Sequence, residues 1–213
     1  MPPQSPDVDE RGASQRILEA AARLIAAHGA AALALNDVAA DARVSKALIH
    51  YHFKDKDRLL ARVVDFVVTG MIARERAALA PYATQRSPLA VDALWRWLEE
   101  ELRRGTIRTL LELDAYPGAG VRAAARRAAT RRREAATETI ERLFSILELR
   151  SRVATPLVAN VAVAFIDGLA LDVERAAMPS ADLAEGEVAG EPGARAPRVS
   201  FDVFWLAMLS LAE

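Results

Sequence analysis

The sequence predicts an all-α fold with about nine helices. Apolar residues recur every three or four positions along most of the 213-residue chain, which is the spacing that gives a helix one buried face. No stretch of useful length alternates apolar and polar residues as a half-buried strand does, and we find no internal repeat. Capping residues, prolines and glycines divide the pattern into segments with the lengths of ordinary globular helices.

The first element is expected to be a helix that follows an unstructured tail. Residues 1–12 contain three prolines and mixed charges without periodicity, and we predict that they form a disordered tail. The helix is expected to begin at Ser14, which can cap it, and to end at His28. Gly29 suits the left-handed backbone position that follows a helix.

Two short helices are expected next, joined by only three or four residues. The first has its apolar residues between Leu35 and Ala42, and the second begins behind Ser45, a suitable N-cap, and reaches Phe53. Two helices of about two turns with so short a connection have the outline of a helix-turn-helix.

The later helices are delimited by the same kinds of signal, namely Ser, Thr or Asp caps, prolines and glycines. Residues 178–199 hold three Pro, three Gly and four acidic residues, and we expect a loop there. The expected helices cover residues 55–80, 88–105, 106–115, 121–149, 155–177 and 199–211.

Composition excludes several classes of protein. The chain has no Cys and three His, which excludes disulfide scaffolds, Cys-ligated metal centres and thiol nucleophiles, and we expect no cofactor. The longest uncharged run, Val153 to Ile166, is too short to cross a bilayer as a helix, and no secretion signal opens the chain. A cytoplasmic protein is expected.

Positive charge is concentrated in one place although the net charge is −1. All three lysines and two arginines lie between Arg43 and Arg58, against two acidic residues. Such a basic spot is a candidate contact for phosphate groups, and a solvated helix face is the alternative.

An ordered set of short motifs surrounds this spot. It comprises an Ile17-Leu18 helix, the Gly29 break, Asp37-Val38-Ala39, Val44-Ser45-Lys46, Ile49-His50-Tyr51-His52-Phe53 and Lys56-Asp57. In these features the sequence resembles the TetR family of bacterial transcriptional regulators, closely over residues 14–60 and in architecture beyond them. The resemblance implies a three-helix helix-turn-helix DNA-binding domain over residues 13–60 and a helical ligand-binding and dimerisation domain over residues 61–213.

A short exposed helix can lie in the major groove of DNA, and helical periodicity turns Val44, Ile49 and Phe53 inward. The alternative for a neighbouring His and Tyr is a packed, hydrogen-bonded pair, and Lys54 is expected to be solvated. The positions that contact DNA in the family correspond here to Lys46, Ala47, His50, Tyr51, His52 and Lys56.

Three departures from the family pattern leave the operator sequence and the DNA affinity open. Arg43 stands where the family commonly has Gly, so a residue with a Cβ is expected in the left-handed region. Residues 33–35, Leu-Ala-Leu, stand where Thr residues commonly touch phosphate, and Asn36 is a candidate cap instead. His50 replaces a frequent Tyr.

The carboxyl-terminal part carries no chemistry typical of an enzyme, because no Gly-rich phosphate loop, metal-ligand spacing or nucleophile–base pair occurs there. By resemblance, the helices over 155–177 and 199–211 form a four-helix bundle with those of a second copy. Packing of the last apolar stripe on its own domain is the alternative. The candidate dimer residues are Gly168, Phe204, Trp205 and Met208.

A ligand pocket is expected among the aromatic and apolar residues of this part, with Asp167 as a polar anchor. Core packing is the alternative for each of them, a structural ion pair is the alternative for Asp167, and the arginines of residues 122–133 are expected to be solvated. The candidate pocket residues are Phe66, Met71, Trp95, Leu111, Tyr116, Phe144, Phe165 and Asp167.

The resulting interpretation is a homodimeric, ligand-responsive transcriptional regulator, a repressor that binds a palindromic operator and is released by a small-molecule effector. The first alternative is a small-molecule-binding protein of the same fold without sequence-specific DNA binding. The second is a helical enzyme that uses carboxylates in the pocket.

Overall fold

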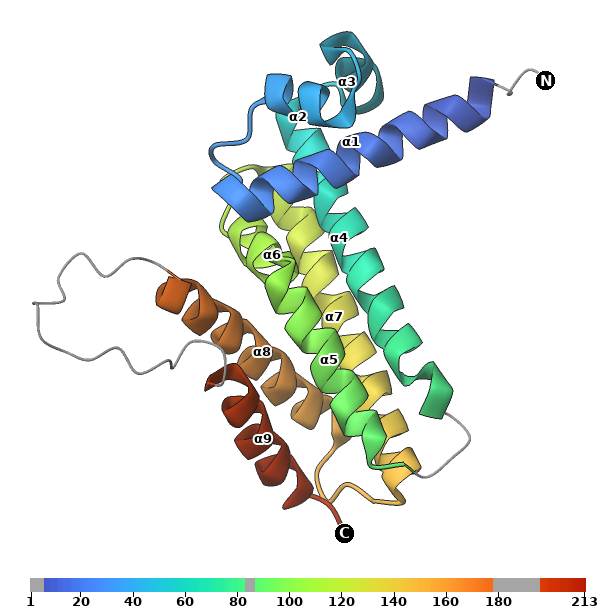
Figure 1. Ribbon diagram of the computed structural model, residues 1–213, viewed down its shortest axis with the longest axis vertical. Coiled ribbons are helices and arrows are strands. Elements are labelled where there is room, and N and C mark those ends of the chain that lie inside the picture. Colours follow the sequence, from blue (N-terminus) through green and yellow to red (C-terminus); the bar gives the residue numbers. More distant parts are fainter. Residues whose placement is uncertain (1–5, 83–86, 178–195) are drawn as a thin grey trace, which may run out of the picture. The chain divides into compact units, whose positions relative to one another are not determined.

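The computed structural model describes residues 6–82, 87–177 and 196–213. Within these ranges the chain forms nine α-helices and a 3₁₀ helix (Ala80–Tyr82), and the β pairing is limited to an isolated antiparallel bridge between Ser151 and Ala212 (Figure 1). The all-α prediction is therefore confirmed. The α-helices are α1 (Pro6–His28), α2 (Leu35–Ala42), α3 (Lys46–Phe53), α4 (Lys56–Leu79), α5 (Leu89–Arg103), α6 (Thr106–Asp114), α7 (Ala119–Leu147), α8 (Thr155–Ala177) and α9 (Ala196–Leu209).

The helices group into two compact units that are not consecutive along the chain. The first unit combines residues up to 71 with residues 104–131, and the second combines residues 72–103 with residues 132–213. The long helices α4 and α7 each contribute to both units. The functional boundary between residues 60 and 61 falls inside α4 and stays a prediction.

The start of α1 differs from the prediction. The helix begins at Pro6, so residues 6–12 are helical instead of forming a disordered tail, and Ser14 lies inside the helix and does not cap it. Proline is tolerated in the first turn of a helix, where its missing N–H would have no partner. Pro6 is therefore compatible with the start of α1 and does not indicate a tail. Residues 1–5 lie outside the described part of the chain.

Most of the other boundaries follow the predicted caps. The Ser45 hydroxyl accepts the Leu48 N–H at 3.2 Å. The Asp55 carboxylate accepts the Arg58 N–H at 2.8 Å at the start of α4. The helix α9 begins at Ala196, earlier than predicted, so the last residues of the expected 178–199 loop are helical; its residues 178–195 are not among the described ones.

In the first unit, α6 holds the turn that leads from α1 into α2. Gly29 ends α1 with φ +85°, as predicted, and the next N–H, that of Ala30, donates to the Glu112 carboxylate of α6 at 2.8 Å. Arg108 donates to the other oxygen of Glu112 at 2.9 Å. A Cβ at position 29 would lie 3.1 Å from the same carboxylate, so both backbone conformation and close approach favour glycine there.

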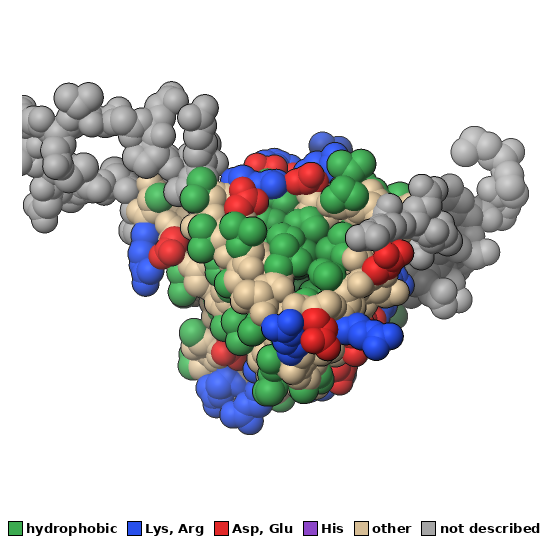
Figure 2. Space-filling view, turned by 90° about the horizontal axis from the view of Figure 1, so that it is seen from below, with side chains coloured by type: hydrophobic (Ala, Val, Ile, Leu, Met, Phe, Trp, Pro, Cys, Tyr) green, Lys and Arg blue, Asp and Glu red, His purple; other side chains and the backbone are tan. Residues whose placement is uncertain are grey.

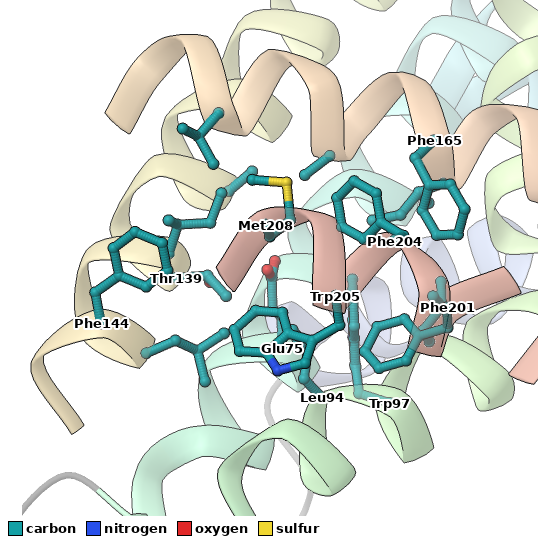
Figure 3. Close-up of a pocket in the computed structure, with 17 residues that line it drawn as sticks. Glu75, Leu94, Trp97, Thr139, Phe144, Phe165, Phe201, Phe204, Trp205 and Met208 are labelled. Atoms are coloured by element: carbon teal, nitrogen blue, oxygen red, sulfur yellow. The ribbon is translucent and has the colours of Figure 1, made fainter. Parts of the chain in front are cut away.

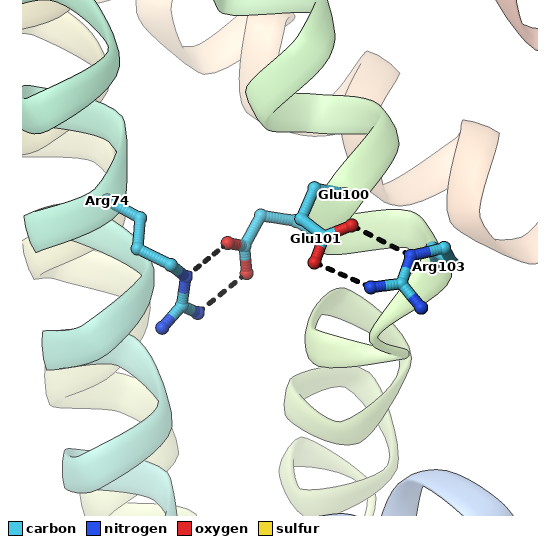
Figure 4. A network of polar contacts seen from close by, with 4 residues as sticks. All are labelled: Arg74, Glu100, Glu101 and Arg103. Carbon is cyan, nitrogen blue, oxygen red and sulfur yellow. Dashed lines mark hydrogen bonds and ion pairs between the residues drawn. The ribbon is translucent and has the colours of Figure 1, made fainter.

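In the second unit, α5 and the adjoining parts of α4 and α7 pack with α8 and α9 around a core that includes Leu79, Leu98 and Leu143. A polar contact is embedded among these helices, because the fully buried Glu101 carboxylate of α5 accepts two hydrogen bonds from Arg74 of α4 (Figure 4). The buried carboxylate is thus paired with a guanidinium that is itself partly exposed.

The helix α8 is the one helix of the described residues that is long and apolar enough to cross a bilayer. Within its Thr155–Ala176 segment, an 18-residue stretch has a mean hydropathy of 1.7, and 28% of that stretch is buried. The sequence expectation considered only the uncharged run that Asp167 ends, whereas this segment includes Asp167 and Asp172. Length and composition do not distinguish a membrane span from a core helix.

Candidate functional site

The helix-turn-helix predicted from the sequence is present as α2, a tight turn and α3. The side chains of Ile49 and Phe53 in α3 are buried as predicted, and Val44 in the turn is half-buried. The helices α1, α2 and α3 contact one another, so this inner face of α3 is covered by the unit's own core.

The opposite face of α3 is open to solvent. Lys46, Ala47, His50 and Tyr51 are all exposed, Tyr51 to 66%. Residues three and four apart lie on the same side of a helix, so these four form one outward face. The face carries the basic side chain of Lys46 and the rings of His50 and Tyr51. The short side chain of Ala47 between them allows another surface to approach the helix closely.

The turn adopts the conformation expected from Arg43. Its φ and ψ are 53° and 49°, the left-handed region, and the Val44 N–H that follows donates to the Ala39 carbonyl at 3.0 Å. The proposed Asn36 cap is wrong, because α2 begins at Leu35 with Ala34 in the N-cap position and no side-chain cap. The buried Leu33 anchors the segment before the helix and fixes this register.

The two histidines of α3 have different surroundings. His50 Nδ1 lies 3.0 Å from the Lys54 carbonyl, and since a carbonyl only accepts, Nδ1 carries the proton and a neutral ring presents Nε2 as an acceptor. His52 is half-buried against the edge of Tyr51, at 5.3 Å between ring centroids, and its Nε2 is buried without a hydrogen-bond partner in the described residues. A phosphate contact of His52 would therefore have to use Nδ1.

Lys56 is partly engaged inside the unit. It opens α4 half-buried, and its Nζ donates to the Ala31 carbonyl at 3.1 Å, which leaves two N–H groups for another acceptor. Lys54, by contrast, is exposed, as expected of a solvated residue.

A second candidate site is a partly open cavity in the second unit (Figure 3). Its volume is about 50 Å³, and its walls are almost entirely apolar. Of the predicted pocket residues, Phe144 and Phe165 line it. Phe204, Trp205 and Met208, predicted at the dimer contact, also line it, so this stripe packs within its own unit, which was the alternative expected for it.

The other predicted pocket residues do not meet at this cavity. Phe66, Met71, Leu111 and Tyr116 belong to the first unit. Their helical spacing identified side chains that face inward, but such spacing does not tell which inward face borders a cavity.

Two predicted pocket residues of the second unit have structural partners instead. Trp95 packs against Phe201 at 5.1 Å between ring centroids and does not line the cavity. Asp167 accepts a hydrogen bond from Arg132 at 2.5 Å, so it forms the structural ion pair that was its alternative.

Sequence reasoning missed the acidic residue of the cavity. Glu75 of α4 is buried at the cavity wall, and burial raises its pKa from the ordinary 4.5 to about 7; the Thr139 hydroxyl, Arg132 and Arg76 oppose the shift, and Glu138 adds to it. In the sequence Glu75 stands between two arginines, which is typical of a solvated helix face. Nothing in the sequence signalled its burial.

This shift predicts that the wild type loses stability relative to Glu75→Gln as pH rises. Between 4.5 and about 7 the folded chain keeps a proton that the unfolded chain has lost, so the free energy of unfolding falls with rising pH. The full loss, roughly 3 kcal/mol, is reached above the folded pKa and is absent below the unfolded one. Urea unfolding of both proteins across this range measures it, and a difference that is constant with pH would contradict the prediction.

An exposed apolar stripe runs along α8 and α9. In α8, Leu157, Val161 and Leu171 are exposed, and Gly168 lies on the same stripe, where an added Cβ would meet nothing within 4 Å. In α9 the exposed residues recur at intervals of four and three, as in a helix–helix seam, and they are Val199, Val203 and Leu206. A space-filling view from below shows apolar side chains gathered among charged ones on the lower face of the molecule (Figure 2).

Comparison with known proteins adds independent findings. The sequence model of the bacterial regulatory proteins of the tetR family matches residues 17–63. No curated protein matches the chain. A putative TetR-family transcriptional regulator from Rhodococcus sp. has a similar structure, with a TM-score of 0.67 and 21% identity over 93% of this chain and 99% of the other.

Two further similar structures hold small molecules. A putative transcriptional regulator from Saccharomonospora viridis, in complex with choline, has a TM-score of 0.57 and 22% identity over 94% of this chain and 98% of the other. The SmeT–triclosan complex has a TM-score of 0.62 and 18% identity over 92% of this chain and 90% of the other. At these identities the likeness shows the fold. The tetR family model thus matches the helix-turn-helix region of this chain, and the similar structures share the fold of the chain as a whole.

Proposed function

We propose that the protein is a ligand-responsive transcriptional regulator that binds a palindromic operator as a homodimer in the cytoplasm, represses transcription there, and is released by a small-molecule effector. The observation that carries the proposal is the exposed outer face of α3, formed by Lys46, Ala47, His50 and Tyr51. A helix with such a face fits the major groove, and two copies related by a two-fold axis would reach grooves about 34 Å apart or a multiple of this.

The exposed stripe of α8 and α9 supports the homodimer. Large apolar side chains that are exposed and contiguous mark an interaction surface, and a two-fold contact uses the same surface on both copies. We therefore assign the contact to this stripe, with Gly168 within it, and not to Phe204, Trp205 and Met208, which line the cavity.

The cavity supports an effector site. Similar structures hold choline and triclosan, so the fold accepts small molecules. The single helix α4 begins at Lys56, beside the helix-turn-helix, and carries Glu75 at the cavity. An effector would release DNA by binding better to the arrangement of α4 that fits the operator less well.

Binding to duplexes that do and do not contain the operator, over a range of salt concentrations, tests the role of α3 and Lys56. We expect Lys56→Ala to weaken binding to both duplexes alike and to reduce the salt slope by about 0.9 for each phosphate that the variant no longer neutralises. We expect His50→Ala to reduce the preference for the operator by about tenfold, because it removes a hydrogen bond to a base edge.

Lys54→Ala is the matched control for charge, since Lys54 is exposed nearby and is expected to change little. The DNA-binding proposal fails if Lys56→Ala keeps the wild-type salt slope and His50→Ala keeps the wild-type preference.

One observation favours the alternative, a ligand-binding protein without operator recognition. The start of α2 offers Leu33, Ala34 and Leu35, which have no hydroxyl groups for phosphate, and Ala34 provides no cap. Footprinting on the DNA upstream of the chain's own gene distinguishes the two, because a protected palindrome supports the regulator and its absence at every salt concentration supports the alternative.

A further inference from the structure

The cavity contains a carboxyl group that has no cation of its own. Glu75 is buried, and its side chain accepts a hydrogen bond from the uncharged Thr139 hydroxyl. Glu75 forms no ion pair within the described ranges of the chain. Burying a carboxylate without a cationic partner is unfavourable, and it is therefore uncommon outside functional sites.

The nearest arginines are already committed to other carboxylates. Arg132 of α7 is bonded to Asp167 of α8 at 2.5 Å, and Arg76 of α4 is bonded to Glu138 of α7 at 2.6 Å. Both attract Glu75, but each has its charge balanced elsewhere. The space around Glu75 thus carries one acidic group without a matching base.

The walls of the cavity suit flat apolar groups. Phe165 of α8 and Phe204 of α9 stack with their centroids 4.3 Å apart and their planes within 6°, and Trp205 lines the same cavity as Glu75 (Figure 3). Aromatic rings both bury apolar surface and attract a cation over their faces. Trp97, also at the wall, has a buried Nε1–H without a partner in the described part of the chain.

We propose that the cavity takes a mostly apolar, ring-containing molecule with one protonated amine, whose ammonium group donates to the Glu75 carboxylate. The inference rests on the proposed function of the cavity as the effector site. A charge-assisted hydrogen bond is about twice as strong as a neutral one, so the amine is preferred over a hydroxyl. A carboxylate on the ligand would face the Glu75 charge and is rejected.

Three naphthalene probes of nearly equal size test the charge preference with the full chain. They are 2-(2-naphthyl)ethylamine, 2-(2-naphthyl)ethanol and 3-(2-naphthyl)propanoate, each titrated calorimetrically at neutral pH. We expect the amine to bind at least about tenfold more tightly than the alcohol, and the propanoate to bind most weakly. This comparison needs no variant.

Two variants locate the preference. Glu75→Gln keeps the shape of the side chain and its hydrogen bond to Thr139. We expect this variant to bind the amine probe about tenfold more weakly and to bind the alcohol probe with unchanged affinity. Glu141→Gln is the matched control, because it removes an exposed carboxylate of α7 that does not line the cavity. It is expected to change no affinity.

Each outcome decides. Amine preference that disappears in Glu75→Gln supports the inference. Equal or tighter binding of the alcohol to the wild type, or amine preference that persists in Glu75→Gln, overturns it and leaves the cavity as a site for another ligand class. If no probe binds, both the amine preference and the proposed effector site are overturned. The DNA-binding proposal is not affected by this result, because operator binding is measured separately.

Discussion

Val203→Glu combined with Leu206→Glu is expected to convert the proposed dimer into monomers. Both side chains are more than half exposed on α9 in the single chain, and the proposed contact would bury them against a second copy. Each substitution would place a carboxylate in an apolar seam without a cation, and the two-fold axis would double every such penalty. We expect the dissociation constant of the dimer to rise by three orders of magnitude or more, which corresponds to at least about 4 kcal/mol.

Light scattering after size-exclusion chromatography without detergent measures this effect. Leu89→Glu is the matched control, because Leu89 is similarly exposed but belongs to α5 and is not part of the stripe. The variant monomer should also lose most of its operator affinity, since one helix-turn-helix would then bind one half-site. A wild type that is monomeric, or a double variant that stays dimeric, contradicts the assignment of the interface.

Removing Arg74 is expected to give the largest loss of stability from a single substitution. The Glu101 side chain has no exposed surface, and Arg74 donates to its two oxygens at 2.5 and 2.8 Å (Figure 4). These hydrogen bonds raise the pKa of Arg74, so the guanidinium stays charged. Arg74→Ala leaves the carboxylate buried without its cation, and we expect a loss of about 3 kcal/mol or more in the free energy of unfolding.

Two further variants separate the pair from its burial. Arg74→Met combined with Glu101→Leu removes both charges and should come within about 1 kcal/mol of the wild type. Arg103→Ala removes a similar two-bond interaction, with Glu100, but Arg103 is largely exposed and a much smaller change is expected. Urea unfolding at one fixed protein concentration compares them, and equal losses for Arg74→Ala and Arg103→Ala would refute the argument.

The helix-turn-helix was predictable because its signals are local. Ser45 caps α3, Gly29 ends α1 and Arg43 takes the left-handed turn, and each of these depends on residues within one helical turn in the sequence. The inward and outward faces of α3 follow from the same periodicity. Where a boundary was wrong, as at Pro6, the residue was compatible with both a tail and a first helical turn.

The cavity was not predictable because its lining comes from five helices. Phe144 and Phe165 were expected there, but Glu75 was hidden between two arginines, and Phe204 was expected at the dimer contact. A helix has more than one inward side when it packs against several neighbours, and periodicity does not say which neighbour each side meets.

By itself the sequence determined the all-α class, the order of the helices and the exposed face of α3, since capping, chain breaks and apolar spacing act over a few residues. Only the tertiary structure decided which apolar side chains enclose the cavity, that Asp167 is paired while Glu75 is not, and which stripe of α8 and α9 stays uncovered. Those features depend on contacts between helices that are far apart in the chain, where burial and charge pairing are set by the neighbours and not by the residue itself.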